Sequence, residues 1–305
     1  MRTLHHRDGH HGWDRSLPPR AEIASGDVVE LALADCFGGQ LGPDATGADV
    51  AGLDLDLANP LTGPIAVQGA GPGDALRIEI LEVEAGPVGW TTLIPGFGLL
   101  VDHFPDPYAL VSRIADGHVD VGDGLARLPA EPFIGTIGVA PAEAGSHSVI
   151  PPRRVGGNLD CRDVRAGAVL LLPVEVPAAL LSVGDPHAAQ GDGEVCGTAV
   201  ETTATVRLRV EVVPGQAPPA PQLELPVPSA RVDGPRLLTT GVGPDLYTGA
   251  RDATLAMIER LGRDHGLDAA DAYALCSIAA DLRIIEVVDA PNWVVGLDVP
   301  LGVLG

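Results

Sequence analysis

Polar and apolar residues alternate along residues 205–212 more regularly than anywhere else in the chain. Every second position is polar or charged, and the positions between them are valine or leucine. Successive side chains of a β-strand point to opposite faces of a sheet. The pattern therefore predicts a strand with one exposed face and one buried face.

A second alternating run starts after Gly73 and changes phase midway. Its polar residues fall on positions 77 and 79 and then on positions 82 and 84. One extra residue in a strand produces such a shift, so we expect a β-bulge near Ile80 and Leu81. Turn glycines also precede β-favouring residues at 26–31 and 167–172, which predicts a β-rich body.

The pattern changes in the last third of the chain. Proline is dense between Val213 and Ser229, which we interpret as a connection to a C-terminal part. Apolar residues at helical spacing then predict a helix over 249–263, and Asp268 is a suitable N-cap for a second helix to about Ile278. Residues 282–288 have the composition of a strand.

These elements predict a mainly β fold with a smaller C-terminal α/β portion, α+β overall. We expect residues 1–215 to form a β-sandwich or barrel-like body that carries the site. Residues 216–305 would pack on this body rather than fold independently, because the one-sided apolar stripe of a helix needs a surface to cover.

Charge narrows the range of partners. The chain of 305 residues contains 19 arginines, no lysine and a formal net charge of −22 at pH 7. Such a charge repels phosphate backbones and anionic membrane surfaces, so we expect neither nucleic acid nor a membrane as a partner. The lack of lysine excludes Schiff-base chemistry, a phosphate-binding-loop lysine and amide hydrolysis through a catalytic lysine.

Apolar runs and cysteines bear on the location. The longest apolar run, Ala168–Gly184, is shorter than the roughly 20 residues that cross a bilayer as a helix, and it contains Glu175 and two prolines. The histidine-rich N-terminus lacks the apolar stretch of a secretory signal. The cysteines are widely spaced, without the pattern of a zinc finger or a disulfide framework. We expect a cytoplasmic protein.

Potential ligands and proton-transfer groups are densest between Asp185 and Glu201. Asp185, His187, Asp192 and Glu194 lie within ten positions, and the glycines at 191 and 193 allow a sharp turn between them. The flanking apolar and alternating runs place this cluster on a connection between two predicted strands.

Three kinds of chemistry fit this cluster. Its oxygens and imidazole can hold a divalent cation that activates water, with Glu194 as a base that is not a ligand and His187 as the strongest ligand candidate. Alternatively, Cys196 is a nucleophile activated by His187. A third possibility is a purely structural ion, such as calcium, in a binding module. The local sequence does not decide between these.

Two other segments could contribute to the site. Asn158 and Asp160 are two positions apart, which places both side chains on one face of an extended segment, although Asn and Asp are also ordinary turn formers. The segment 9–19 contains His10 and His11 and is either a plain loop or a lip over the site.

Several short motifs, spread over almost the whole chain, occur together in a fixed order. They are Gly12-Trp13-Asp14, Pro95 to Leu100, Ile137 to Pro141, the Gly-Gly-Asn-Leu-Asp that ends at Asp160, Gly184 to Glu194, and Asp271 to Ser277. In content and order this set resembles the acetamidase/formamidase family, and the block from Asp185 to Glu194 is its most specific part. Pro186 departs from the family pattern where we expect a flexible glycine, which could narrow the loop.

The resemblance implies a mostly β fold with a C-terminal α/β portion, a homo-oligomer (dimer or higher), and hydrolysis of short aliphatic amides to a carboxylate and ammonia. It also implies metal dependence. The alternatives are a non-catalytic metal-binding β protein and a cysteine-dependent amide hydrolase that uses Cys196 and His187.

The resulting hypothesis assigns a role to each candidate residue. A divalent metal, zinc first and with calcium as a second or structural ion, is held by His187, Asp185, Asn158 and Asp160. Glu194 moves the proton, with His187 and Asp192 as further catalytic candidates. Gln190 stabilises the oxyanion together with backbone N–H groups. Phe97 and Gly98 bind and size the substrate, a small amide.

Overall fold

The computed structural model describes residues 3–303 except for 101, 103, 123, 226–234, 270–271, 273–274 and 277–278. Its strands are β1 (Thr3–His5), β2 (Ala21–Ile23), β3 (Val28–Leu33), β4 (Thr62–Val67), β5 (Ala75–Leu93), β6 (Tyr108–Ala115), β7 (His118–Val121), β8 (Ala126–Pro129), β9 (Phe133–Gly138), β10 (Gly156–Asn158), β11 (Val169–Pro173), β12 (Leu181–His187), β13 (Glu201–Val213), β14 (Gln222–Leu225), β15 (Arg236–Gly243), β16 (Asp281–Glu286) and β17 (Trp293–Pro300). The helices are α1 (Gly47–Ala51) and α2 (Leu246–His265), with 3₁₀ turns η1 (His6–Asp8), η2 (Leu55–Leu57) and η3 (Leu301–Val303).

The mainly β, α+β fold is confirmed, because strands far outnumber helices in the described part of the chain. The strand pairings link into one large mixed sheet. Of the two forms expected for the body, a closed barrel is not formed by the described strands. No helix in the described part of the chain is long and apolar enough to cross a membrane.

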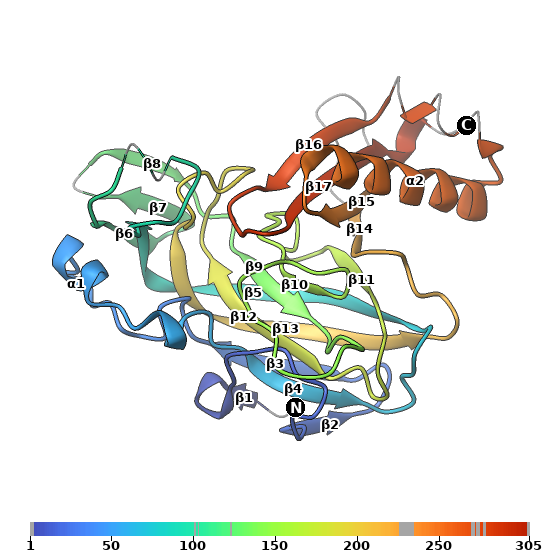
Figure 1. Ribbon diagram of the computed structural model, residues 1–305, viewed down its shortest axis with the longest axis horizontal. Helices are drawn as coiled ribbons and strands as arrows, with labels where there is room; N and C mark the ends of the chain where they lie inside the picture. The colour runs from blue at the N-terminus through green and yellow to red at the C-terminus, as the bar shows by residue number, and fades with distance from the viewer. Residues whose placement is uncertain are drawn as a thin grey trace.

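The antiparallel pair β5 and β13 runs through the middle of the body (Figure 1). In β13 the side chains of Val206, Leu208 and Val210 are fully buried, while the residues between them are partly exposed, as the alternation predicts. The bulge is confirmed as well. Arg207 lies opposite Glu82 and Leu208 opposite residue 80, so position 81 is the extra residue in β5.

Strand β9 lies in a segment whose pattern predicts no strand, and every one of its residues is buried. It pairs with β10 on one side and β12 on the other, and Thr136 lies opposite both Asn158 and Gly184. The apolar run 168–183, expected as a single strand that brings Asn158 close to Asp185, is divided between β11 and β12, and β9 is the strand that lies between the two residues.

The C-terminal strands β14–β17 and helix α2 lie at one end of the molecule, and the β6–β8 strands project at the other (Figure 1). The helix predicted over 249–263 is α2, and the strand predicted over 282–288 is β16. The helix predicted from Asp268 includes positions outside the described residues. The proline-rich stretch contains β14, which pairs with β11 of the body, so it is not simply a linker.

Helix α2 has a complete N-cap. The Asp245 carboxylate accepts hydrogen bonds from the Thr248 backbone N–H at 2.8 Å and from the Thr248 hydroxyl at 2.7 Å. Replacing Asp245 by alanine should lower the free energy of unfolding by about 1 kcal/mol, because a helix N–H loses its partner. The denaturant midpoint measures this change. Asp252→Ala, at an exposed position of the same helix, is the control and should not destabilise.

Candidate active site

A cavity of about 340 Å³ opens between the body and the β16–β17 connection. Part of its lining, the apolar wall, includes Phe37, Leu55, Ile94, Phe97 and Ile150. The lining also contains five carboxylates, the acidic wall, which are Asp160, Asp185, Glu194, Glu201 and Asp289. All five are at least nine-tenths buried. Such a cavity can enclose a small molecule while presenting many oxygen atoms to one end of it.

Asp185 and His187 stand together because they lie two positions apart on β12. His187 also lies opposite Glu201 in the pairing of β12 with β13. Its Nε2 atom is 3.2 Å from an Asp185 oxygen and 2.9 Å from a Glu201 oxygen. All three side chains are buried, so this contact between one imidazole and two carboxylates is shielded from water.

The hydrogen bonds of Gln190 determine which ring nitrogen of His187 carries the proton. The Gln190 amide nitrogen donates to the backbone oxygen of Asp160 at 2.6 Å, so its amide oxygen faces His187 Nδ1 at 2.9 Å. Because an amide oxygen only accepts, Nδ1 must carry a proton. Neutral His187 therefore presents an unprotonated Nε2 to the carboxylates, as in metal-binding histidines. The Phe133 ring, 4.9 Å away and edge-on, holds the imidazole in place.

Electrostatics at this contact favour a positive charge. Burial alone would lower the pKa of His187, but the carboxylates of Glu201 and Asp185 outweigh burial and hold it well above its usual value. Burial would likewise raise the pKa of Asp185, yet the adjacent His187 holds it below its usual value. Two buried carboxylates beside Nε2 require a cation there, either a proton or a metal ion.

Asn158 belongs to a hydrogen-bond network rather than standing free. Its amide nitrogen donates to Asp289 at 2.6 Å, and its oxygen accepts from the Asn59 amide at 3.1 Å and from the Thr136 hydroxyl. Thr136 also donates to Asp185 at 3.3 Å. The network therefore connects the two sides of the acidic wall through β9.

Gly135 on β9 permits the close approach of two carboxylates. A Cβ atom at this position would lie 2.7 Å from Asp160 Oδ1 and 2.8 Å from Asp185 Oδ2, closer than atoms can approach. Neither Asp160 oxygen accepts a hydrogen bond from a donor in the described residues. The Asp289 carboxyl also contacts Asp160, and two carboxyls can bond only through a shared proton.

Glu194 reaches the cavity from a tight turn between β12 and β13. Its backbone φ of 44° is left-handed, and that of Gly193 is 94°. The turn is closed by hydrogen bonds from the Glu194 N–H to Gly191 and from the Gly197 N–H to Glu194. Burial and the carboxylates of Glu201 and Asp289 raise the pKa of Glu194 well above its usual value. A non-glycine residue in this conformation costs energy, which is typical of functional sites.

Sequence reasoning missed three acidic residues of the site, Glu201, Glu286 and Asp289. Burial raises the pKa of Glu286 to about 8 and that of Asp289 to about 7, with Asp289 adding to the effect on Glu286. A signal was present for two of them, because they interrupt an otherwise apolar run, Ile-Ile-Glu-Val-Val-Asp. Asp and Glu are almost never fully buried unless they are paired, so carboxylates within an apolar run point to a site. Asp289 adds the C-terminal portion to a site that the sequence predicts within residues 1–215.

The structure gathers most of the predicted site residues. Asn158, Asp160, Asp185, Glu194 and Phe97 line the cavity. His187 lies directly behind its acidic wall. Gln190 does not line this cavity, since both ends of its amide are used by His187 and Asp160. Its contact with substrate stays a prediction, while its amide contacts His187 and the Asp160 backbone.

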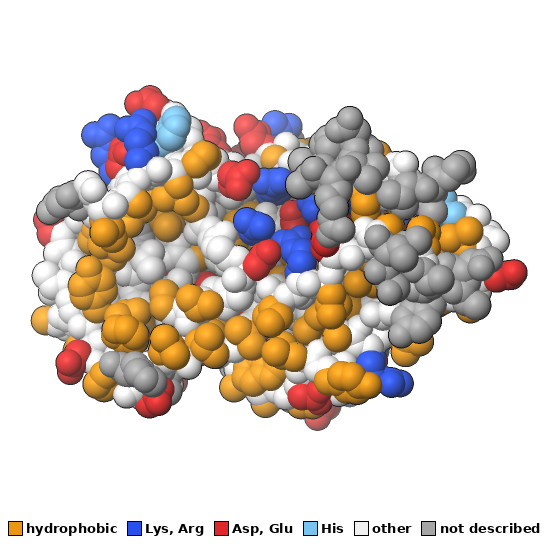
Figure 2. Space-filling view, turned by 90° about the horizontal axis from the view of Figure 1, so that it is seen from above, with side chains coloured by type: hydrophobic (Ala, Val, Ile, Leu, Met, Phe, Trp, Pro, Cys, Tyr) orange, Lys and Arg blue, Asp and Glu red, His pale blue; other side chains and the backbone are white. Residues whose placement is uncertain are grey.

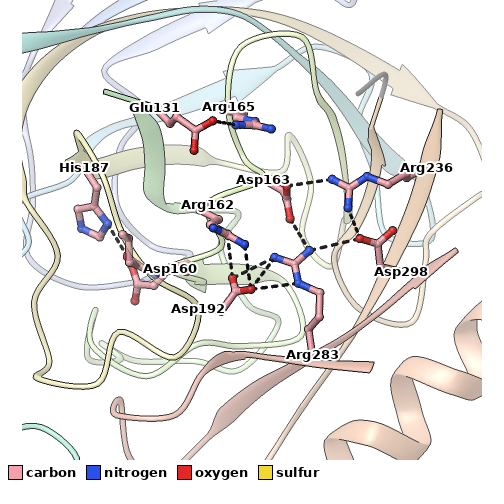
Figure 3. Close-up of polar contacts among 11 residues, drawn as sticks. Glu131, Asp160, Arg162, Asp163, Arg165, His187, Asp192, Arg236, Arg283 and Asp298 are labelled. Carbon is pink, nitrogen blue, oxygen red and sulfur yellow. Dashed lines mark hydrogen bonds and ion pairs between the residues drawn. The ribbon is translucent and has the colours of Figure 1, made fainter. Parts of the chain in front are cut away.

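Other candidates lie elsewhere. Asp192 is outside the cavity, where its carboxylate pairs with Arg162 and Arg283 (Figure 3). Gly98 packs against the Cys196 backbone in a neighbouring pocket. The Cys196 thiol lies 3.2 Å from the Thr198 carbonyl, and it lines pockets other than this cavity.

The two N-terminal histidines also lie outside the cavity. His10 is hydrogen-bonded to Ser182 and to the Gly12 carbonyl, and His11 approaches the Ala58 carbonyl. Neither is among the residues that line the cavity. A role as ligands supplied from the N-terminus therefore has no support in these contacts.

The chemistry of the acidic wall suits a cation. Among the described residues, ligand atoms of Asp160, His187 and Glu194 lie within 4.8 Å of one another, and a second group of this kind joins Cys36 to the two carboxylates that contact His187. No arginine from the described part of the chain lines the cavity. The carboxylates thus outnumber the one imidazole that the described residues place beside them, and a divalent ion would satisfy them.

Fold and site together define a β-rich protein with a buried, acidic, histidine-containing cavity. The family model described as "Acetamidase/Formamidase family" matches residues 2–148 and 143–305. The chain belongs to this family. This confirms the resemblance found in the sequence motifs.

Individual proteins named acetamidase or formamidase are similar to this chain in structure and in sequence. The crystal structure of an acetamidase from Bacillus halodurans is similar over 100% of both chains, with 33% identity and a TM-score of 0.89. An acetamidase of Mycolicibacterium smegmatis is 29% identical over 68% of this chain and 66% of its own length. A formamidase of Methylophilus methylotrophus is 28% identical over 67% and 64%. The chain thus spans about two thirds of the length of these two relatives.

Proposed function

We propose that the protein hydrolyses short aliphatic amides, such as formamide and acetamide, to the carboxylate and ammonia. The observation that carries this proposal is the cavity lined by both buried carboxylates and apolar side chains, in a chain whose relatives are named acetamidase and formamidase. A volume of about 340 Å³ suits a small amide together with water. The assembly of subunits and the cytoplasmic location remain predictions.

The same proposal includes a divalent metal, with zinc as the first candidate because a histidine nitrogen joins carboxylate oxygens. Asp185, His187, Glu201 and Asp160 would hold it. Asn158 is better suited to orienting Asp289, since its polar atoms are already hydrogen-bonded. When bound, such an ion polarises a carbonyl oxygen and lowers the pKa of water. Calcium prefers six or more oxygen ligands and remains a prediction for a second site.

The residues of the chain supply the proton transfers. Glu194 faces the cavity and accepts the proton of the attacking water, then returns it to the leaving nitrogen, so that ammonia departs. Burial and the neighbouring carboxylates raise its pKa, which favours a group that both accepts and donates a proton. Gln190 keeps the proton of His187 on Nδ1, and the apolar wall excludes bulk water from the reaction.

The cysteine-dependent alternative has little geometric support. The recorded contacts of His187 are with Asp185, Gln190, Glu201 and Phe133. No contact between His187 and Cys196 occurs among the described residues. A nucleophilic cysteine needs a base within hydrogen-bond reach.

The direct test is ammonia release from formamide, acetamide and propionamide by the zinc-loaded protein, with benzamide as an oversized comparison. We expect release from the short amides and little from benzamide. If none of these amides yields ammonia, the alternative of a non-catalytic metal-binding protein is favoured. Inhibition by a thiol reagent but not by a chelator would favour the cysteine mechanism.

Phe97 should set the upper limit on substrate size. Its ring packs on Gly197, where a Cβ atom would lie 2.5 Å from the ring. Phe97→Ala would open the cavity, and we expect the ratio of kcat/KM for butyramide over acetamide to rise about 10-fold, since each methylene in a pocket contributes about 1–3 kcal/mol. Leu100→Ala, in the same loop but outside the cavity, is the control and should leave the ratio unchanged.

A further inference from the structure

The turn that carries Glu194 is attached to the C-terminal strand β16. The Gly193 N–H donates to the Ile285 carbonyl at 2.8 Å, and Gly193 forms a parallel bridge with Glu286. The turn therefore extends the free edge of β16. Since Glu194 follows immediately, its position depends on a strand that is far away in the sequence.

A second attachment lies one residue earlier. Arg283 on β16 donates to the Asp192 carboxylate from two nitrogens. Its Nε lies 3.2 Å from Oδ2, and its Nη2 lies 2.9 Å from Oδ1 and 3.0 Å from Oδ2. Its third nitrogen, Nη1, lies 2.7 Å from Asp163, and the side chain is only 15% exposed (Figure 3). The flat guanidinium is thus held on both sides and cannot easily swing away.

The ion pair between Arg283 and Asp192 is part of a larger network of ion pairs. A cleft of about 500 Å³ contains Arg283 and is lined mainly by arginines and acidic side chains. Figure 2, viewed from above, shows basic and acidic side chains gathered near the middle of this face. In a chain with a formal charge of −22, pairing arginines with these carboxylates offsets local repulsion.

We propose that Arg283 is a positioning residue that, through Asp192, holds the Glu194 turn in its reactive place. The proposal rests on the proposed amide hydrolysis with Glu194 as base. Glu194 is held in a left-handed conformation, which the chain would leave if the turn were released. A two-pronged contact fixes both the distance and the angle of the Asp192 carboxylate, and a single backbone hydrogen bond at Gly193 does not.

Arg236 offers a matched control. It contacts the same two carboxylates, Asp163 and Asp298, as Arg283 does, and its side chain is 14% exposed. Of these two arginines, only Arg283 has a contact with Asp192, whose carboxylate also pairs with Arg162. Lysine at either position keeps the positive charge but lacks the planar fork. The two substitutions therefore disturb the ion-pair network to a similar degree, and only one releases the turn.

The test compares Arg283→Lys with Arg236→Lys in metal-loaded protein. With acetamide, Arg283→Lys should lower kcat about 10- to 100-fold and change KM less than about threefold, because a displacement near 1 Å suffices for such a loss. Arg236→Lys should leave kcat within about threefold of wild type. Asp192→Asn should resemble Arg283→Lys, and the double variant should be no worse than the worse single one.

Amide hydrogen exchange provides a readout that needs no activity. Exchange over residues 191–196 should be faster in Arg283→Lys than in wild type and unchanged in Arg236→Lys. Equal losses of kcat in the two lysine variants, or unchanged exchange in Arg283→Lys, would overturn the positioning role. If wild type releases no ammonia, the proposed function fails, while exchange still decides whether Arg283 holds the turn.

Discussion

Glutamine in place of Glu194 is expected to lower kcat for acetamide by about 10³-fold while KM changes little. Glutamine has nearly the same shape as glutamate but cannot accept the proton of the attacking water, and a positioned base contributes about 10²–10⁴-fold. Because the Glu194 side chain itself is buried, no solvent-exposed group can replace it. Steady-state ammonia release in metal-loaded protein measures the loss.

The control for this experiment lies two residues further along the same turn. Cys196→Ser changes a side chain that lines neighbouring pockets but not the cavity, and it should keep kcat within about threefold of wild type. If Cys196→Ser abolished turnover and Glu194→Gln did not, the base assignment would be wrong and the thiol mechanism would take its place.

The strands with one exposed face could be predicted from the sequence. Alternation located β13. In β5, a change of phase in the alternation located the bulge at position 81. Strand β9 could not be found in this way, because both of its faces are buried and its residues show no alternation. This strand nevertheless sets the relative placement of Asn158 and Asp185.

Site residues that are close together in the sequence could be predicted to meet, and those that are far apart in the sequence could not. Spacing of two along β12 placed Asp185 and His187 on one face. By contrast, Glu201 joins them only through strand pairing, and Asp289 only through packing of the C-terminal strands on the body. Sequence spacing carries no information about such pairings, because they depend on which strand edges meet.

Asp192 illustrates why neighbouring acidic residues can have different roles. It lies two residues from Glu194, as Asp185 does from His187, but on a turn with glycines instead of on a strand. A turn reverses the chain, so its side chains point in different directions. Glu194 faces the cavity, and Asp192 faces the arginines of the neighbouring cleft. Spacing of two therefore predicts a shared face within a strand but not across such a turn.

Removal of divalent metal is expected to abolish amide hydrolysis and to lower the melting temperature together. Treatment with a strong chelator should reduce kcat by at least about 10²-fold, and zinc should restore it, because a Lewis acid contributes several kcal/mol to such reactions. The buried carboxylates would then repel one another. An ion present at about 1,000 times its Kd stabilises the folded state by about 4 kcal/mol, which calorimetry with and without zinc can measure.

Variants of the acidic wall separate loss of metal from loss of catalysis. Glu201→Gln removes a carboxylate that contacts His187, so metal analysis should find less zinc per chain and the thermal shift on adding zinc should shrink. Glu194→Gln should lose activity yet retain most of the zinc, since in the proposed mechanism Glu194 moves a proton. Full activity in exhaustively chelated protein that contains no metal would contradict the metal proposal. Zinc lost equally from both variants would instead make Glu194 a ligand, and the ligand group of Asp160, His187 and Glu194 would then replace the proposed one.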